Sequence, residues 1–114
     1  MDTFQGLEVW RRGCKLCVTL YGLMSKCRDF GYKDQVTRAA LSIPSNIAEG
    51  YERGSRKDYA RFLDMAKGSC GELRTQLYIG IEAGLVEREQ AAQCLDEAGQ
   101  ITRILQRIIN KLRD

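Results

Sequence analysis

The sequence predicts an all-α protein, an antiparallel up-down four-helix bundle whose second helix is kinked at Pro44. Three observations lead to this fold class. Apolar residues recur at steps of three and four along four segments, which is typical of helices that bury one face. No segment alternates apolar and polar residues as a half-buried strand does. The breaks between the segments are short, as they are between antiparallel neighbours in a bundle.

The first helical segment begins near Leu7, after Gly6 as a tolerable N-cap. Its predicted buried face follows alternating steps of three and four. The members of this face are Leu7, Trp10, Cys14, Cys17, Tyr21 and Met24. The stretch CRDFGYKD then breaks the period, and Gly31 is predicted to mark the turn.

The second helical segment is expected to begin near Asp34. Its predicted buried face is Val36, Ala40, Ile43 and Ile47. Pro44 has no N–H to donate to the carbonyl of Ala40, and its ring crowds that turn, so the helix should kink or restart there. Small hydrogen-bonding residues surround the break and could satisfy the freed carbonyl: Ser42, Ser45 and Asn46.

The third and fourth segments carry clear end signals. Ser55 with Asp58 three residues later resembles a capping box and predicts the start of the third helix. Gly84 followed by Leu85 predicts its glycine C-cap, and the fourth helix should run from about Glu87. The predicted buried face of the third helix is Tyr59, Leu63, Ala66, Cys70, Leu73, Leu77 and Ile81. That of the fourth is Ala91, Leu95, Ala98, Ile101, Leu105, Ile108 and Leu112.

Length and composition indicate one globular domain, residues 1–114, with a mild net charge of +3. No signal peptide or apolar run long enough to cross a membrane is visible, so we expect a cytoplasmic protein without a membrane partner. Five scattered cysteines fit buried thiols in a reducing compartment better than a disulfide framework.

The sequence favours a protein that is not an enzyme. It has no histidine, so Ser-His or Cys-His nucleophile pairs, histidine metal ligands and Glu-x-x-His di-iron motifs are absent. Cys14 and Cys17 form a single CxxC pair on an apolar face, which we interpret as packing, so no metal is predicted. Two carboxylate pairs, Glu49 with Glu52 and Asp58 with Asp64, lack an apolar pocket. No phosphate-binding glycine loop appears, and no cofactor is expected.

Two patterns have both a structural and a functional interpretation. Arg38, Ser42, Asn46, Glu49 and Arg53 form a polar stripe at helical spacing. The stripe is either a solvated face beside the proline or a half-buried seam where a subunit or ligand docks. Gly68 and Gly71 lie inside the third helix, where each costs roughly 1 kcal/mol relative to alanine. The two glycines indicate either that this helix tolerates glycine or that a neighbouring backbone approaches it closely.

Basic residues gather in two places. The first cluster surrounds the start of the third helix and comprises Arg53, Arg56, Lys57 and Arg61. The second follows one face of the last helix at steps of four and comprises Arg103, Arg107 and Lys111, with Arg113 nearby. Each cluster is either an ordinary solvated surface or part of a phosphate-binding surface.

The run QVTRAALSIPSNIAEGYERGSRKDYARFLDMAKGSCGEL, together with LEVWRRG, resembles the bacterial four-helix-bundle family named for proteins encoded in intervening sequences of 23S rRNA genes. The resemblance covers nearly the whole chain. Its most diagnostic residues are Ser42, Pro44, Asn46, Glu49, Gly50, Arg53, Ser55, Phe62, Gly68, Ser69 and Glu72. Relatives often have Asp in place of Gly6 and a Pro and Glu where this chain has Cys27, Arg28 and Asp29.

The resemblance implies a bundle that assembles into a ring-like homopentamer and has no enzymatic activity. The family is also distantly similar to the accessory variability proteins of diversity-generating retroelements, whose basic pentameric barrels bind nucleic acid and a reverse transcriptase. We therefore expect a non-catalytic homo-oligomer that binds structured RNA or other nucleic acid, RNA or DNA, through its basic helix faces. The alternative is a scaffold that binds a protein partner through the polar stripe, and an unrecognised carboxylate enzyme is a remote third possibility.

Overall fold

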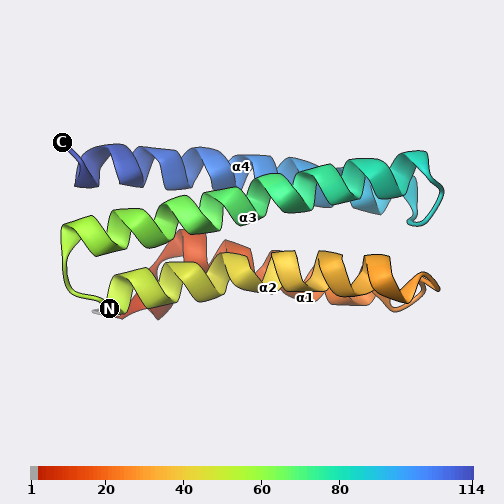
Figure 1. Cartoon of the computed structure of the whole chain (residues 1–114), viewed down its shortest axis with the longest axis horizontal. Coiled ribbons are helices and arrows are strands. Elements are labelled where there is room, and N and C mark those ends of the chain that lie inside the picture. The colour runs from red at the N-terminus through yellow and green to blue at the C-terminus, as the bar shows by residue number, and fades with distance from the viewer. Residues whose placement is uncertain (1–2) are drawn as a thin grey trace.

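The computed structural model describes residues 3–114 and has four long helices and no strand in that range (Figure 1). A short 3₁₀ turn, Phe4–Gly6, precedes them. The helices are α1 (Glu8–Met24), α2 (Phe30–Glu52), α3 (Arg56–Glu82) and α4 (Arg88–Leu112). They run antiparallel along a body of 42 × 22 × 21 Å. The predicted fold class, an all-α four-helix bundle, is confirmed.

Each helix packs on two neighbours. α1 contacts α2 and α4, and α3 likewise contacts α2 and α4, while no packing contact joins α1 to α3 within residues 3–114. α1 and α3 therefore lie diagonally across the bundle. The side chains that fill the core include Leu20, Met24, Ile43, Ile47, Leu63, Leu73, Leu77, Ile101 and Leu105, all fully buried.

The buried face of α1 differs from the prediction. Tyr21 is 51% exposed, and Trp10 and Cys14 are only half-buried. The face that enters the core is rotated and consists of Val9, Gly13, Leu16, Cys17, Leu20 and Met24. A Cβ at Gly13 would lie 3.5 Å from Ile43 and 3.6 Å from Pro44, which is ordinary van der Waals contact between α1 and α2. Of the apolar residues of α1, those on the side of Leu16 and Leu20 enter the core.

α2 begins four residues earlier than predicted, at Phe30. The Asp29 side chain caps it by accepting a hydrogen bond from the backbone N–H of Tyr32, at 3.0 Å. Gly31 therefore lies in the first helical turn and does not mark the connection between the helices. The four core residues predicted for this helix are all buried: Val36, Ala40, Ile43 and Ile47.

The predicted restart at Pro44 is wrong, because α2 continues unbroken from Phe30 to Glu52, and a kink there is not confirmed. The proline ring is buried beside Gly13 of α1. The polar residues around it bond to carbonyls other than that of Ala40. Ser42 Oγ donates to Ala39 O at 2.7 Å, and Asn46 Nδ2 donates to Ser42 O at 2.8 Å. A proline is thus accommodated inside a continuous, packed helix.

The ends of α3 and the start of α4 follow the sequence signals. The backbone N–H of Asp58 donates to Ser55 Oγ at 3.1 Å, as the capping box predicts. Gly84 has φ +73°, and the N–H of Leu85 donates to Gly80 O at 2.8 Å, which gives the predicted glycine-terminated end. Glu87 caps α4. Of the predicted buried face of α4, Leu95, Ile108 and Leu112 are half-buried, because Cys94, Gly99 and Ile109 occupy the innermost positions.

Stability should decline in alkaline solution, because burial raises the pKa of the Cys70 thiol to about 11. Above about pH 9 the unfolded chain loses this proton while the folded chain keeps it, so stability is complete below the unfolded pKa and is lost as the pH rises toward 11. Tyr32, whose pKa is raised by burial to about 12, adds to the decline above pH 10. We expect a loss of about 1–3 kcal/mol between pH 8 and pH 10.5.

Urea unfolding followed by circular dichroism at the two pH values measures this loss. The Cys70→Ala variant is the control and should show a smaller decline, with the remainder due to Tyr32 and to Cys17 and Cys94, whose pKa values burial also raises. An unfolding midpoint that is unchanged between the two pH values would contradict the prediction.

Candidate nucleic-acid interface

The turn between α2 and α3 carries the first predicted basic cluster. Gly54 adopts φ +87° there, which reverses the chain within a few residues, and Ser55 then caps α3. Arg53 at the end of α2 and Arg56, Lys57 and Arg61 at the start of α3 are all exposed. The structure therefore brings all four members of this cluster to one end of the bundle (Figure 1).

Two of these arginines are held on a single aromatic ring. The guanidinium carbon of Arg53 lies 4.9 Å from the ring centroid of Phe62, and that of Arg61 lies 4.6 Å from it. Each also has a carboxylate partner: Arg53 Nε is 3.0 Å from Glu49, and Arg61 Nη2 is 3.6 Å from Asp58. The two guanidinium groups are thus positioned, with part of their charge compensated locally.

The second cluster meets the first at this same end. Arg56 Nη2 donates to the backbone carbonyl of Lys111, in the last turn of α4, at 2.8 Å. Arg113 pairs with Asp64 of α3 at 2.5 Å. A shallow cavity of about 490 Å³ lies between the helix ends, lined by Arg56, Lys57, Ala60, Arg61, Leu112 and Arg113. The sequence could not show that the two clusters, about 50 residues apart, form one surface.

The row on α4 continues along the side of the bundle. Arg103, Arg107 and Lys111 are exposed, and none of them forms an ion pair with another residue of the range 3–114. Arg103 and Arg107 border a groove of about 510 Å³ between α1 and α4. Their charges are therefore available to a phosphate group.

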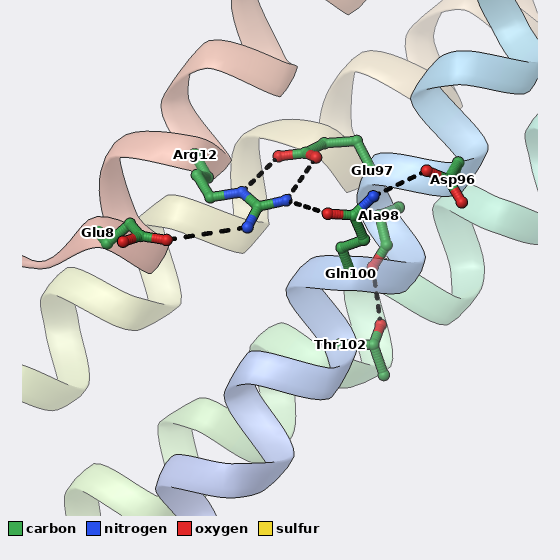
Figure 2. A network of polar contacts seen from close by, with 7 residues as sticks. All are labelled: Glu8, Arg12, Asp96, Glu97, Ala98, Gln100 and Thr102. Carbon is green, nitrogen blue, oxygen red and sulfur yellow. Dashed lines mark hydrogen bonds and ion pairs between the residues drawn. The ribbon is translucent and has the colours of Figure 1, made fainter.

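A polar clasp joins α1 to α4 beside this groove (Figure 2). Arg12 Nε and Nη2 donate to the two carboxylate oxygens of Glu97 at 2.8 and 2.7 Å, and Nη2 also donates to Gln100 Oε1 at 2.6 Å. Gln100 Nε2 in turn donates to Asp96 at 2.8 Å. The bidentate bond to Glu97 raises the pKa of Arg12 above its ordinary value. Sequence reasoning missed this clasp, because no local pattern links residues 85 positions apart.

The polar stripe of α2 divides into two parts. Ser42 and Asn46 are half-buried, and the Ser42 hydroxyl oxygen lies 2.7 Å from that of Ser69 on α3. This pair ties the centre of SIPSNIAEG to the Gly68-Ser69 motif inside one chain. Arg38 and Glu49 are exposed at the ends of the stripe.

The glycines of the family motif have different surroundings. A Cβ at Gly50 would lie 2.7 Å from Phe62 Cβ and 3.3 Å from the carbonyl oxygen of Tyr59, so this glycine lets α2 and α3 touch. A Cβ at Gly68 or Gly71 would have no atom within 4 Å outside its own helix. The close backbone approach considered for Gly68 and Gly71 is therefore not made within the chain. Glu72, one turn beyond Gly68, is also exposed.

The candidate enzymatic and metal groups remain apart. Within residues 3–114, no three Cys, Asp or Glu side chains are arranged so that they could hold a metal ion. Glu49 pairs with Arg53, Asp58 with Arg61, and Asp64 with Arg113, so three of the four carboxylates considered as acid pairs are engaged with cations. In the same range, no helix has the length and apolar character needed to cross a membrane.

Comparison with protein-family models gives a match over residues 5–107 to the family described as 23S rRNA-intervening sequence protein. The chain belongs to this family. Among solved structures, this family member is similar to a crystal structure from Bacteroides thetaiotaomicron, described as a protein with unknown function from the S23 ribosomal protein family. The two are 25% identical with a TM-score of 0.83, over 89% of this chain and 97% of the other. No curated protein matches the chain.

Membership in the 23S rRNA-intervening sequence protein family confirms the resemblance that SIPSNIAEG and its neighbours indicated. Neither comparison describes a catalytic activity. Within this family member, the structure assigns distinct places to the motif residues: Pro44 and Gly50 serve helix packing, Ser42 and Ser69 join α2 to α3, and Gly68 and Glu72 face outward.

Proposed function

We propose that the protein is a non-catalytic homo-oligomer that binds structured RNA or other nucleic acid through the basic surface at the joined ends of α3 and α4. The observation that supports this most directly is the row of Arg103, Arg107 and Lys111. These cations lack carboxylate partners within residues 3–114 and run into the basic turn at Arg56. Neutralising phosphates with such groups and releasing counterions is the main source of affinity for nucleic acids. The family description refers to 23S rRNA, which makes structured RNA the first ligand to test.

The outer faces of α1 and α3 support the oligomer. On α3, Met65 and Ile79 are about half exposed on either side of the open Gly68, and on α1 Val18 is 73% exposed. These patches lie on diagonal helices, so contact between them joins different surfaces of two copies. Such head-to-tail contacts close into rings when the rotation permits.

The charged residues beside the two apolar patches also favour a contact between α1 of one copy and α3 of the next. Lys15 lies one turn from Val18 on α1, and Glu72 lies one turn from Gly68 on α3, and neither forms an ion pair within its own chain as far as the structure describes it. Opposite charges thus flank the two apolar patches. We propose a homopentamer, with the number five taken from the family resemblance. A ring would repeat the basic surface once per copy and raise the affinity for a long nucleic acid.

The alternative, a scaffold that docks a protein through the polar stripe of α2, has less support. Ser42 and Asn46, at the centre of the stripe, are half-buried and form their hydrogen bonds with the carbonyls of α2 and with Ser69. They offer a partner little unmet hydrogen-bonding capacity.

Fluorescence anisotropy of a labelled RNA hairpin, titrated with the protein over a range of salt concentrations, tests the proposal. We expect the logarithm of the association constant to fall linearly with the logarithm of the salt concentration. The triple variant Arg103→Ala, Arg107→Ala, Lys111→Ala should weaken binding at low salt by at least about tenfold. The slope of this logarithmic plot should also become shallower by about one for each phosphate that a copy no longer neutralises.

A matched control removes the same charge at the opposite end of the bundle: Lys26→Ala, Arg28→Ala, Lys33→Ala. This variant should bind nearly as well as the unmodified protein. Absence of RNA binding at low salt, or equal losses of affinity in the two triple variants, would refute the assignment of the α4 row.

A further inference from the structure

The groove between α1 and α4 lies directly beside the unpaired arginines. It has a volume of about 510 Å³, within the range of small-molecule binding sites. The residues that line it are Leu7, Glu8, Val9, Arg12, Gln100, Arg103, Ile104, Arg107 and Ile108. α1 contributes one wall and α4 the other, and the Arg12–Glu97 clasp fixes the distance between them (Figure 2).

The floor of the groove is apolar. Leu7, Ile104 and Ile108 pack against the core but are only half-buried, so each leaves part of its side chain open. Ile104 and Ile108 are one helical turn apart, which forms a continuous strip about 6 Å long on α4. A flat apolar group resting on this strip would cover hydrocarbon that now contacts water.

The rim of the groove is cationic. Arg103 and Arg107 are also one turn apart, and both are exposed. The carboxylates nearest the groove, Glu8 and Glu97, are already engaged with Arg12, at 3.8 and 2.7 Å. These carboxylates therefore do not neutralise Arg103 and Arg107. The remaining positive charge at the rim favours binding of an anionic chain.

From this arrangement we infer that the groove accepts an unpaired nucleobase, and that the protein prefers single-stranded segments of RNA to duplex. This inference rests on the proposed nucleic-acid function and specifies the part of the nucleic acid that is recognised. The backbone phosphates lie on Arg103 and Arg107, and a base between them rests on Ile104 and Ile108.

A base in a duplex cannot occupy this groove, because both of its faces are stacked on neighbouring base pairs. An unpaired base in a loop or bulge has open faces and can be turned outward. The Gln100 amide, which lines the groove, is already bonded to Arg12 and Asp96, so it does not select the edge of the base. The geometry thus favours unpaired over paired nucleotides without requiring a particular base.

The test compares a labelled single-stranded RNA with a labelled RNA duplex that contains the same strand, by anisotropy at constant low salt. The unmodified protein should bind the single strand about tenfold more tightly, because a base on the apolar strip removes hydrocarbon from water. The variant Ile104→Gln replaces half of the apolar strip with an uncharged polar side chain and retains both arginines. It should lose about tenfold in affinity for the single strand and change its affinity for the duplex less than twofold.

Leu95→Gln is the matched control, because Leu95 is a half-buried α4 residue that does not line the groove. It should retain the preference for the single strand. If Ile104→Gln has lost helicity by circular dichroism, Ile108→Gln at the other end of the strip replaces it.

The outcomes separate the two proposals. Equal affinity for the single strand and the duplex in the unmodified protein, or a preference that is unchanged in Ile104→Gln, would overturn the inference while leaving nucleic-acid binding in place. Failure to bind either RNA would overturn both.

Discussion

Replacing Gly50 with valine (Gly50→Val) is expected to lower the free energy of unfolding by about 3 kcal/mol. The first side-chain carbon at this position would lie 2.7 Å from the Cβ of Phe62 and 3.2 Å from the ring of Tyr59. The Tyr59 ring can shift, but Phe62 Cβ and the Tyr59 carbonyl oxygen, at 3.3 Å, are fixed to the α3 backbone, so α2 and α3 must separate. Because small domains are stable by only about 5–15 kcal/mol, this loss is a large part of the total.

Urea unfolding monitored by circular dichroism measures the effect, with Gly71→Ala as the control. Gly71 is also a glycine in the interior of a long helix, but a Cβ there would have nothing within 4 Å outside its own helix. The alanine should therefore stabilise the protein by about 0.5–1 kcal/mol through helix propensity alone. A free energy of unfolding for Gly50→Val equal to that of the unmodified protein would contradict the close packing of α2 on α3 at Gly50.

The variant Gly68→Leu is expected to convert the proposed oligomer into single chains. In the isolated chain the leucine meets open space and improves helix propensity by about 1 kcal/mol, so the bundle itself should be no less stable. In the ring, however, the leucine would stand in the middle of the α3 patch, where the neighbouring copy approaches. Loss of assembly without loss of fold is the result that distinguishes an interface from a core position.

Light scattering coupled to size-exclusion chromatography gives the mass of each species. The unmodified protein should have the mass of five chains, and Gly68→Leu that of one. Ala92→Leu, at an exposed position of α4, is the control and should leave the oligomer intact. An unmodified protein with the mass of a single chain, or a Gly68→Leu variant that remains assembled, would contradict the proposed α1–α3 contact.

The sequence predicted most of the fold because its strongest signals are local. Four helical periods, the Ser55 cap and the glycine at position 84 all depend on residues within a few positions of one another, and the structure confirms each of them. α2 begins before the predicted Asp34, because the Asp29 side chain caps it and Gly31 is accommodated in its first turn. Glycine is tolerated in a first helical turn that a side chain caps.

The rotation of α1 could not be predicted from its own sequence. Apolar residues lie on most sides of this helix, so two overlapping stripes compete, one through Trp10 and Tyr21 and the other through Leu16 and Leu20. The second enters the core, where α1 packs on α2 and α4. Pro44, taken alone as a signal of interruption, lies buried beside Gly13 of α1 inside a continuous helix. Both outcomes depend on a neighbouring helix that no local pattern specifies.

The basic residues of the candidate site were identified from the sequence as two separate clusters. Their joining through Arg56 and the carbonyl of Lys111, and the groove beside Arg103 and Arg107, arise from antiparallel packing of distant segments. The clasp between Arg12 and Glu97 has the same origin. Sequence spacing located the charges, and the tertiary structure determines which of them remain unpaired.

The up-down arrangement of the four helices has a consequence for any ring built from them. The start of α1, the α2–α3 turn and the end of α4 all lie at one end of the bundle, as Figure 1 shows. In a cyclic assembly whose axis runs along the bundles, every copy points in the same direction, so one rim gathers the basic turns while the other rim carries the α1–α2 and α3–α4 connections. Such a ring is polar, and a nucleic acid would meet it from one side, the side on which any tag attached to either terminus would also stand.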